Sequence, residues 1–119
     1  MIPLREIAFA RSGDKGGSAN IAVFGRTPAA YRWLRRNLTE AVVMNFFRPL
    51  GPTGVRRYDV PNLEALNFVL AGVLAGGASR SLRIDAQGKA LGAALLELNV
   101  DYPGRGRPRG PPRARRRAP

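Results

Sequence analysis

The chain of 119 residues contains no cysteine and no histidine. Without cysteine it has no disulfide, no thiolate nucleophile, and no Cys-ligated zinc or iron–sulfur cluster. The absence of histidine removes the commonest metal ligand and the commonest general base at neutral pH. We therefore expect no metal and no cofactor. Any catalysis has to use carboxylates, lysine, arginine, tyrosine, serine or threonine, or residues of a partner chain.

Long hydrophobic runs are also missing. No apolar run approaches the roughly twenty residues that a helix needs to cross a bilayer. The first six residues, Met1 to Glu6, do not have the pattern of a secretory signal. We therefore expect a cytoplasmic protein that makes no membrane contact.

Acidic residues are scarce, since 8 Asp and Glu stand against 20 Lys and Arg, for a net charge of +12. Half of this excess lies after Val100. From Pro103 onward the sequence is Arg/Pro/Gly-rich and has no apolar residue large enough to offset the entropy of ordering it. The sequence thus predicts one domain over residues 1–102 and a disordered tail over residues 103–119. We expect nucleic acid to bind only through this tail, without specificity and with strong salt dependence.

The pattern of apolar residues predicts strands mixed with helices. Strands are expected over residues 4–10, 20–24, 55–60, 81–84 and 96–100, with a turn over 85–88. A helix begins at Thr27–Pro28 and restarts at Thr39–Glu40, because each pair offers an N-cap. A second helix is expected over residues 63–73, ended by Gly76–Gly77, while residues 89–95 fit helix or strand. Such an order favours a sheet with its helices on one side, an α+β sandwich.

A polar, Gly-rich segment joins the first two expected strands: Ser12-Gly13-Asp14-Lys15-Gly16-Gly17-Ser18-Ala19-Asn20. Its glycines would let backbone amides turn inward and hold a phosphate or carboxylate with Lys15, while Asp14 orients a hydroxyl or a metal-bound water. It is no Walker loop, because neither serine nor threonine follows the lysine. An ordinary hairpin connection is the alternative. Nine residues is long for one, and long ordered loops often carry function.

Two further clusters are weaker signals. The first comprises Asn67, Gly76, Gly77, Ser79, Arg80, Ser81, Arg83 and Asp85, which also fit a helix C-cap followed by a strand with solvated arginines. The second is a basic helical face at Arg32, Arg35 and Arg36. A nucleic-acid surface would need exposed aromatics among such charges, and here only Trp33 fits that description.

Three blocks of the sequence resemble one known family. They are residues 8–21 (AFARSGDKGGSANI), 58–70 (YDVPNLEALNFVL) and 79–89 (SRSLRIDAQGK), in this order. Across about residues 4–100 the chain resembles the AtuA-like ferredoxin-fold domain, the small C-terminal domain of acyclic terpene utilisation (AtuA-type) proteins or a separate short chain beside them. The resemblance implies a ferredoxin-like α+β sandwich, with a mixed or antiparallel sheet of four to five strands and two main helices on one face. It also implies a role near the catabolism of acyclic terpenoid or branched acids as acyl-CoA thioesters.

We therefore expect an accessory domain or subunit that binds an anionic metabolite, an acyl-CoA or a carboxylate, through the Gly-rich loop. A larger AtuA-type chain would complete the site, and a homo-oligomer is expected. The candidate catalytic residues are Asp14 and Lys15, and the candidate binding residues are Ser12, Gly13, Gly16, Gly17, Asn20, Asn67, Arg80 and Asp85. The alternatives are a stand-alone acyl-CoA hydratase, isomerase or lyase that uses Asp14 and Lys15, a nucleic-acid binder led by the tail, and a purely structural assembly domain.

Overall fold

The computed structural model describes residues 1–73 and 90–103. In chain order the elements are β1 (Ile2–Pro3), β2 (Ala8–Lys15), β3 (Ser18–Gly25), α1 (Pro28–Asn37), α2 (Glu40–Phe46), β4 (Gly54–Val60), β5 (Ala65–Ala71), α4 (Ala90–Leu95) and β6 (Asn99–Val100). Short 3-10 helices cover Leu4–Glu6, Arg48–Leu50 and Pro61–Leu63. None of the helices in the two described ranges is long and apolar enough to span a membrane. The predicted strand 81–84, the turn 85–88 and Gly76–Gly77 lie outside these ranges.

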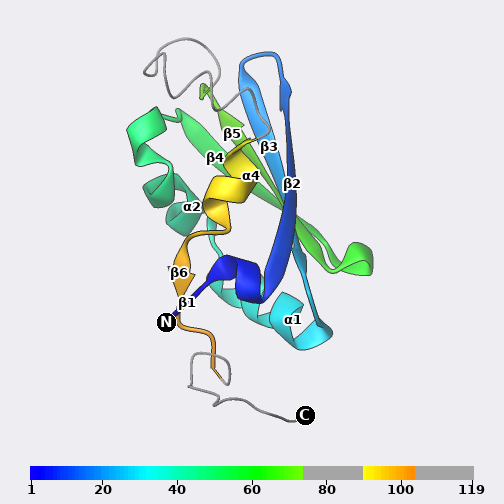
Figure 1. Ribbon diagram of the computed structural model, residues 1–119. Coiled ribbons are helices and arrows are strands. Elements are labelled where there is room, and N and C mark those ends of the chain that lie inside the picture. Colours follow the sequence, from blue (N-terminus) through cyan, green and yellow to red (C-terminus); the bar gives the residue numbers. More distant parts are fainter. Residues whose placement is uncertain (74–89, 104–119) are drawn as a thin grey trace.

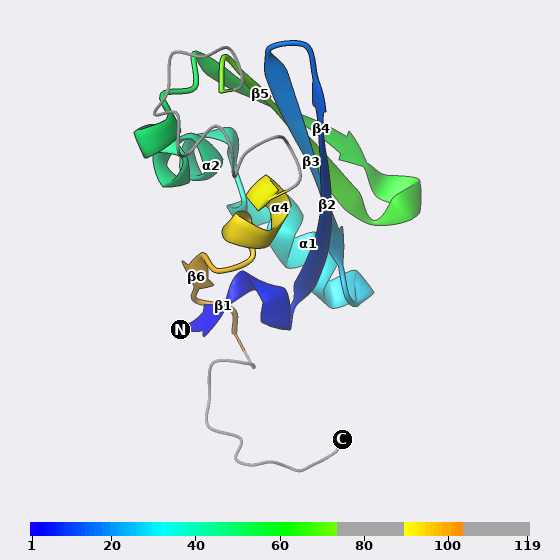
Figure 2. The same cartoon turned by 45° about the horizontal axis from the view of Figure 1, so that its top comes forward.

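The main sheet is antiparallel and has the strand order β2-β3-β5-β4, and β1 pairs with β6 in a separate two-stranded sheet. Helix α1 packs on β3, α2 on β4 and α4 on β2. Figures 1 and 2 show all three helices on the same side of the main sheet. The predicted α+β sandwich with helices on one face is therefore confirmed.

The core fills the space between the sheet and the helices. Alternate residues of the two central strands point into it, because successive side chains of a strand face opposite sides. Its largest fully buried side chains are Phe68, Leu4, Ile21, Leu34, Leu38, Leu66, Leu70, Leu95, Val23, Val43 and Val73. No polar side chain of the described residues joins this buried set.

The first helical region follows the predicted caps. The Thr27 hydroxyl accepts a hydrogen bond from the Ala30 N–H at 3.0 Å and begins α1. The Thr39 hydroxyl accepts from the Val42 N–H at 3.2 Å and begins α2. Each cap satisfies one of the free N–H groups at a helix start. The predicted break at Thr39 is confirmed.

The predicted helix over residues 63–73 is wrong, because Ala65–Ala71 form the central strand β5. Leu66 and Phe68 belong to an alternation of period two that fits a strand as well as the helical spacing fits a helix. Hydrogen-bonded pairing with β3 on one side and with β4 on the other stabilises the strand conformation of this segment. Leu63, expected on the apolar helix face, is 59% exposed. Asn67 therefore lies in the middle of a sheet.

Two other boundaries differ from the prediction, and one ambiguous segment is resolved. Leu4–Glu6 form a 3-10 helix, and the first long strand begins at Ala8 and continues to Lys15. Residues 90–95 are helical, which resolves the ambiguity over 89–95. The last expected strand shortens to Asn99–Val100, the part that pairs with β1.

The β4 edge is tied to the helices by Arg57. Its guanidinium donates hydrogen bonds to the Arg35 and Leu38 carbonyl oxygens at 2.9 and 3.0 Å, and it pairs with Asp59 at 3.0 Å. The backbone N–H of Arg57 donates to the Glu40 carboxylate at 2.8 Å. Arg57 therefore serves the fold and is not available for a ligand.

Candidate functional site

The Gly-rich segment is a tight hairpin. Strand pairing continues to Lys15 and Ser18, so that only Gly16 and Gly17 form the turn. Gly16 has φ +61, the positive value that the first position of a primed two-residue hairpin turn requires. The predicted nine-residue loop is thus wrong, and the ordinary hairpin connection, the alternative, is found. The paired strands leave no inward-turned cradle of amides in this segment.

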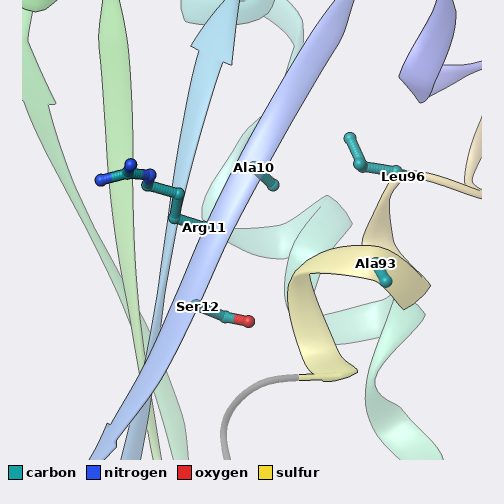
Figure 3. A pocket seen from close by; sticks show the side chains of 5 residues that line it. All are labelled: Ala10, Arg11, Ser12, Ala93 and Leu96. Carbon is teal, nitrogen blue, oxygen red and sulfur yellow. The ribbon is translucent and has the colours of Figure 1, made fainter.

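The strand alternation divides the candidate residues of this hairpin between the two faces of the sheet. Ser12 faces the helices, and its hydroxyl accepts a hydrogen bond from the Gly92 N–H of α4 at 3.1 Å. Figure 3 shows Ser12 pointing toward α4 and Arg11 pointing to the opposite side of β2. Asp14 follows Ser12 on the helix side and is exposed at the end of the hairpin. The hydrogen bond between Ser12 and Gly92 therefore holds α4 against β2.

A shallow depression of about 600 Å³ lies between β2 and α4. Its lining residues are Ala10, Arg11, Ser12, Ala93 and Leu96. Ala10 and Ser12 point toward α4, whereas the Arg11 guanidinium points away over the sheet (Figure 3). The depression therefore combines small apolar side chains with the Ser12 hydroxyl and part of Arg11, whose charged end lies outside it.

The opposite face of the sheet carries no helix of the described ranges (Figures 1 and 2). We call it the open face, and the strand register assigns it described positions on all four strands. These are Phe9, Arg11 and Gly13 of β2; Ser18, Asn20, Ala22 and Phe24 of β3; Ala65, Asn67, Val69 and Ala71 of β5; and Gly54, Arg56, Tyr58 and Val60 of β4. The open face thus gathers residues from two separate stretches of the sequence, 9–24 and 54–71.

Two asparagines meet at the centre of the open face. The Asn20 Nδ2 of β3 donates a hydrogen bond to the Asn67 Oδ1 of β5 at 2.7 Å. This bond leaves the Asn67 Nδ2 group as a donor and the Asn20 Oδ1 as an acceptor for a ligand. Gly13 and Ala22 flank the pair on one side and are too small to cover it, while Val69 and Tyr58 flank it on the other, so that the pair is half-buried. Two predicted binding residues, 47 positions apart, are therefore one amide pair.

Positive charge surrounds this amide pair. Arg11 lies in the same cross-strand row as Asn67, and Arg56 lies in the row of Asn20. Both arginines are exposed, and no Asp or Glu occupies any open-face position. Three strand spacings separate the two arginine strands, or about 14 Å. Within the part of the chain that the structure describes, the open face is therefore a cationic surface without an acidic side chain.

Aromatic rings lie on both edge strands of the open face. Phe9 is 44% exposed and stacks on Phe24 with centroids 4.9 Å apart. The Arg26 guanidinium lies over the Phe9 ring, 5.8 Å from its centroid. Tyr58, on the other edge strand, is 50% exposed. Sequence reasoning missed both exposed rings. The alternation of Phe9 and Arg11 with Ala8 and Ala10 is a signal that could have identified Phe9 as a residue of the exposed strand face.

The structure places none of the remaining candidate residues on the open face. Gly16 and Gly17 are the exposed turn. Arg80 and Asp85 lie outside the described ranges, as does the side chain of Lys15, so the roles expected of these three residues stay predictions. Among residues 1–73 and 90–103, no three acidic side chains gather as metal ligands would.

Comparison with known proteins gives one match. No curated protein sequence and no solved structure matches the chain significantly. The family model described as the AtuA ferredoxin-like domain matches residues 2–101, which include every described strand and helix. This span exceeds four fifths of the chain and coincides with the α+β sandwich. The chain therefore belongs to the AtuA ferredoxin-like domain family.

Proposed function

We propose that this AtuA-type accessory domain binds an anionic metabolite on its open face. The ligand is an acyl-CoA or a carboxylate from the breakdown of acyclic terpenoid or branched acids. The observation that carries the proposal is the Asn20–Asn67 amide pair, held at 2.7 Å between exposed arginines on a face without acidic residues. The Gly-rich segment contributes Gly13 and Asn20 to this face as strand positions and does not act as a loop.

The open face supplies one wall of the site. Small-molecule sites are concave and bury most of the ligand surface, whereas one side of a sheet covers one side of a ligand. The larger AtuA-type chain supplies the second wall. Arg11 and Arg56 stand about 14 Å apart, given the usual spacing of strands. Such a separation suits a ligand with several anionic groups, as an acyl-CoA has.

The chemistry of this face is binding and orientation. The Asn67 Nδ2 group donates to a carboxylate or phosphate oxygen, and an arginine neutralises its charge through charge-assisted hydrogen bonds. Asp14, the candidate internal base, faces the helix side of the sheet. Asp14 therefore does not act on a metabolite that is bound to the open face.

Asn67→Asp is expected to weaken metabolite binding at least about tenfold, because it places a carboxylate beside the anion. The substituted side chain keeps its shape and still accepts the hydrogen bond from Asn20. Asn45→Asp on α2 is the matched control, because Asn45 Oδ1 accepts a hydrogen bond from Arg48 that an aspartate also accepts. The measurement is the amount of acyl-CoA retained by the co-purified complex with the larger AtuA-type chain, determined by mass spectrometry.

The control variant is expected to retain as much metabolite as the unaltered chain. Equal retention by the Asn67→Asp and Asn45→Asp complexes would contradict the proposed site. Thermal unfolding of both variants verifies that the fold is intact before the comparison is made.

A further inference from the structure

We propose that the open face also binds single-stranded nucleic acid, through base stacking on Phe9 and Tyr58. This inference goes beyond the proposed function and does not depend on it. A nucleic-acid surface needs exposed aromatics among positive charges. In the sequence only Trp33 was singled out as meeting this condition. The fold brings Phe9 and Tyr58 to the face that holds Arg11 and Arg56.

The two aromatic rings are separate platforms. Phe9 is braced on one side by its stack with Phe24, so it presents its ring without losing much conformational freedom when a base binds. Tyr58 lies on the opposite edge strand, three strand spacings or about 14 Å away. Sheet-based RNA-binding modules stack two or three bases on the aromatics of a four-stranded antiparallel sheet. The open face has the same number of strands and leaves its rings exposed.

The groups between the rings suit bases and phosphates. The Asn67 Nδ2 donors and the Asn20 Oδ1 acceptor lie on the two central strands, and Asn67 is directly opposite Tyr58, so that they can bind the edges of an unpaired base. Arg11 and Arg56 lie one at each edge for the phosphate backbone, and the Arg26 guanidinium lies over the Phe9 ring, 5.8 Å from its centroid. No carboxylate among the open-face positions repels a polyanion.

The layout favours a strand of nucleotides over other occupants. One mononucleotide is too short to contact both the Phe9 ring and the Tyr58 ring. A second copy of this chain would place arginines against arginines, because the face carries one sign of charge. A duplex buries its bases and cannot stack them on side chains. An unpaired strand uses the aromatics, the amides and the arginines together.

The test measures the affinity of the full-length chain for fluorescent ten-nucleotide oligo(U), oligo(dT) and a ten-base-pair RNA duplex by anisotropy at moderate salt. Phe9→Ala and Tyr58→Ala are each expected to weaken binding of the single strands about fivefold or more, because stacking on one ring is worth about that much. Tyr58→Phe keeps the ring and is expected to bind normally. Tyr102→Ala is the matched control, because Tyr102 packs on Trp33 of α1, on the helix side.

The aromatic substitutions leave the net charge unchanged, so the Arg-rich tail contributes equally to every variant. Single-strand binding that falls in Phe9→Ala and Tyr58→Ala supports the proposal, and tighter binding of one oligonucleotide identifies RNA or DNA as the source. Equal binding of strand and duplex by all variants would overturn it and assign binding to the tail. If Phe9→Ala and Tyr58→Ala leave the affinity for nucleic acid unchanged but weaken binding of the larger AtuA-type chain, the proposal is overturned and the open face is a protein interface.

Discussion

Phe68→Ala is expected to lower the free energy of unfolding by about 3–5 kcal/mol. Phe68 is fully buried, at 0% exposure, and is the largest such side chain in the described core. It lies in the central strand β5 and points toward the helices, where truncation leaves a cavity that the surrounding elements cannot close. The measurement is chemical denaturation followed by circular dichroism, with the slope on denaturant compared between variants to verify two-state unfolding.

Phe9→Ala is the matched control for Phe68→Ala. Phe9 lies in an edge strand on the open face and keeps 44% of its surface exposed, so its removal opens no cavity. It loses the stack with Phe24, which is worth about 0.5–1.5 kcal/mol beyond burial. The expected loss is therefore well below that of Phe68→Ala. Similar losses for both variants would contradict the assignment of the two sheet faces.

Gly25→Ala is expected to destabilise the chain by about 2–3 kcal/mol, the upper part of the range for overpacking. A Cβ atom at Gly25 would stand 2.6 Å from the Tyr31 N and 2.7 Å from its Cα. These are backbone atoms of α1, so relief requires the helix to move away from β3. The measurement is the midpoint of thermal unfolding, which is expected to fall by roughly 8–24 °C for a domain of about a hundred residues.

Gly54→Ala provides the comparison for Gly25→Ala. Gly54 begins β4, and no atom lies within 4 Å of a Cβ placed there. Alanine at such a position restricts the unfolded chain and is expected to be neutral or to stabilise by up to about 1 kcal/mol. A fall in the midpoint for Gly54→Ala as large as that for Gly25→Ala would show that the contact between β3 and α1 is not the cause.

Local signals predicted the parts of the fold that depend on neighbouring residues. Thr27–Pro28 and Thr39 begin helices because a hydroxyl cap acts within three residues of its own position. The strands at 20–24 and 55–60 follow from their own composition and are found with slightly wider bounds. The separation of the helices onto one face follows from the order of these elements.

The parts that failed depend on pairing between distant segments. Residues 63–73 have apolar spacings that suit a helix and a strand, and only pairing with β3 and β4 selects the strand. The polar composition of residues 12–20 suggested a loop. In the structure the first part of this segment pairs with the second part, so that the strands of the hairpin continue to Lys15 and Ser18. Neither partner can be identified from the local sequence.

The candidate site was predicted in part for the wrong reason. Asn20 and Asn67 were named from a loop and a helix, and their contact exists because β3 and β5 are neighbours in the sheet. Ser12 was named from the same loop, yet strand alternation turns it to the helix side, where it binds the Gly92 N–H. Arg11 and Arg56 were not named, because solvated arginines carry no local signal of function.

The most direct test of the central claim, that the open face is the binding surface, is an NMR titration of the ¹⁵N-labelled full-length chain with isovaleryl-CoA. This method detects the weak binding expected of a half-site without the larger AtuA-type chain. We expect shifts of the Asn20 and Asn67 side-chain amides and of backbone amides on both sides of Arg11, with the amides of α1 and α2 unmoved. Shifts confined to the helix side, or to the depression between β2 and α4, would contradict it.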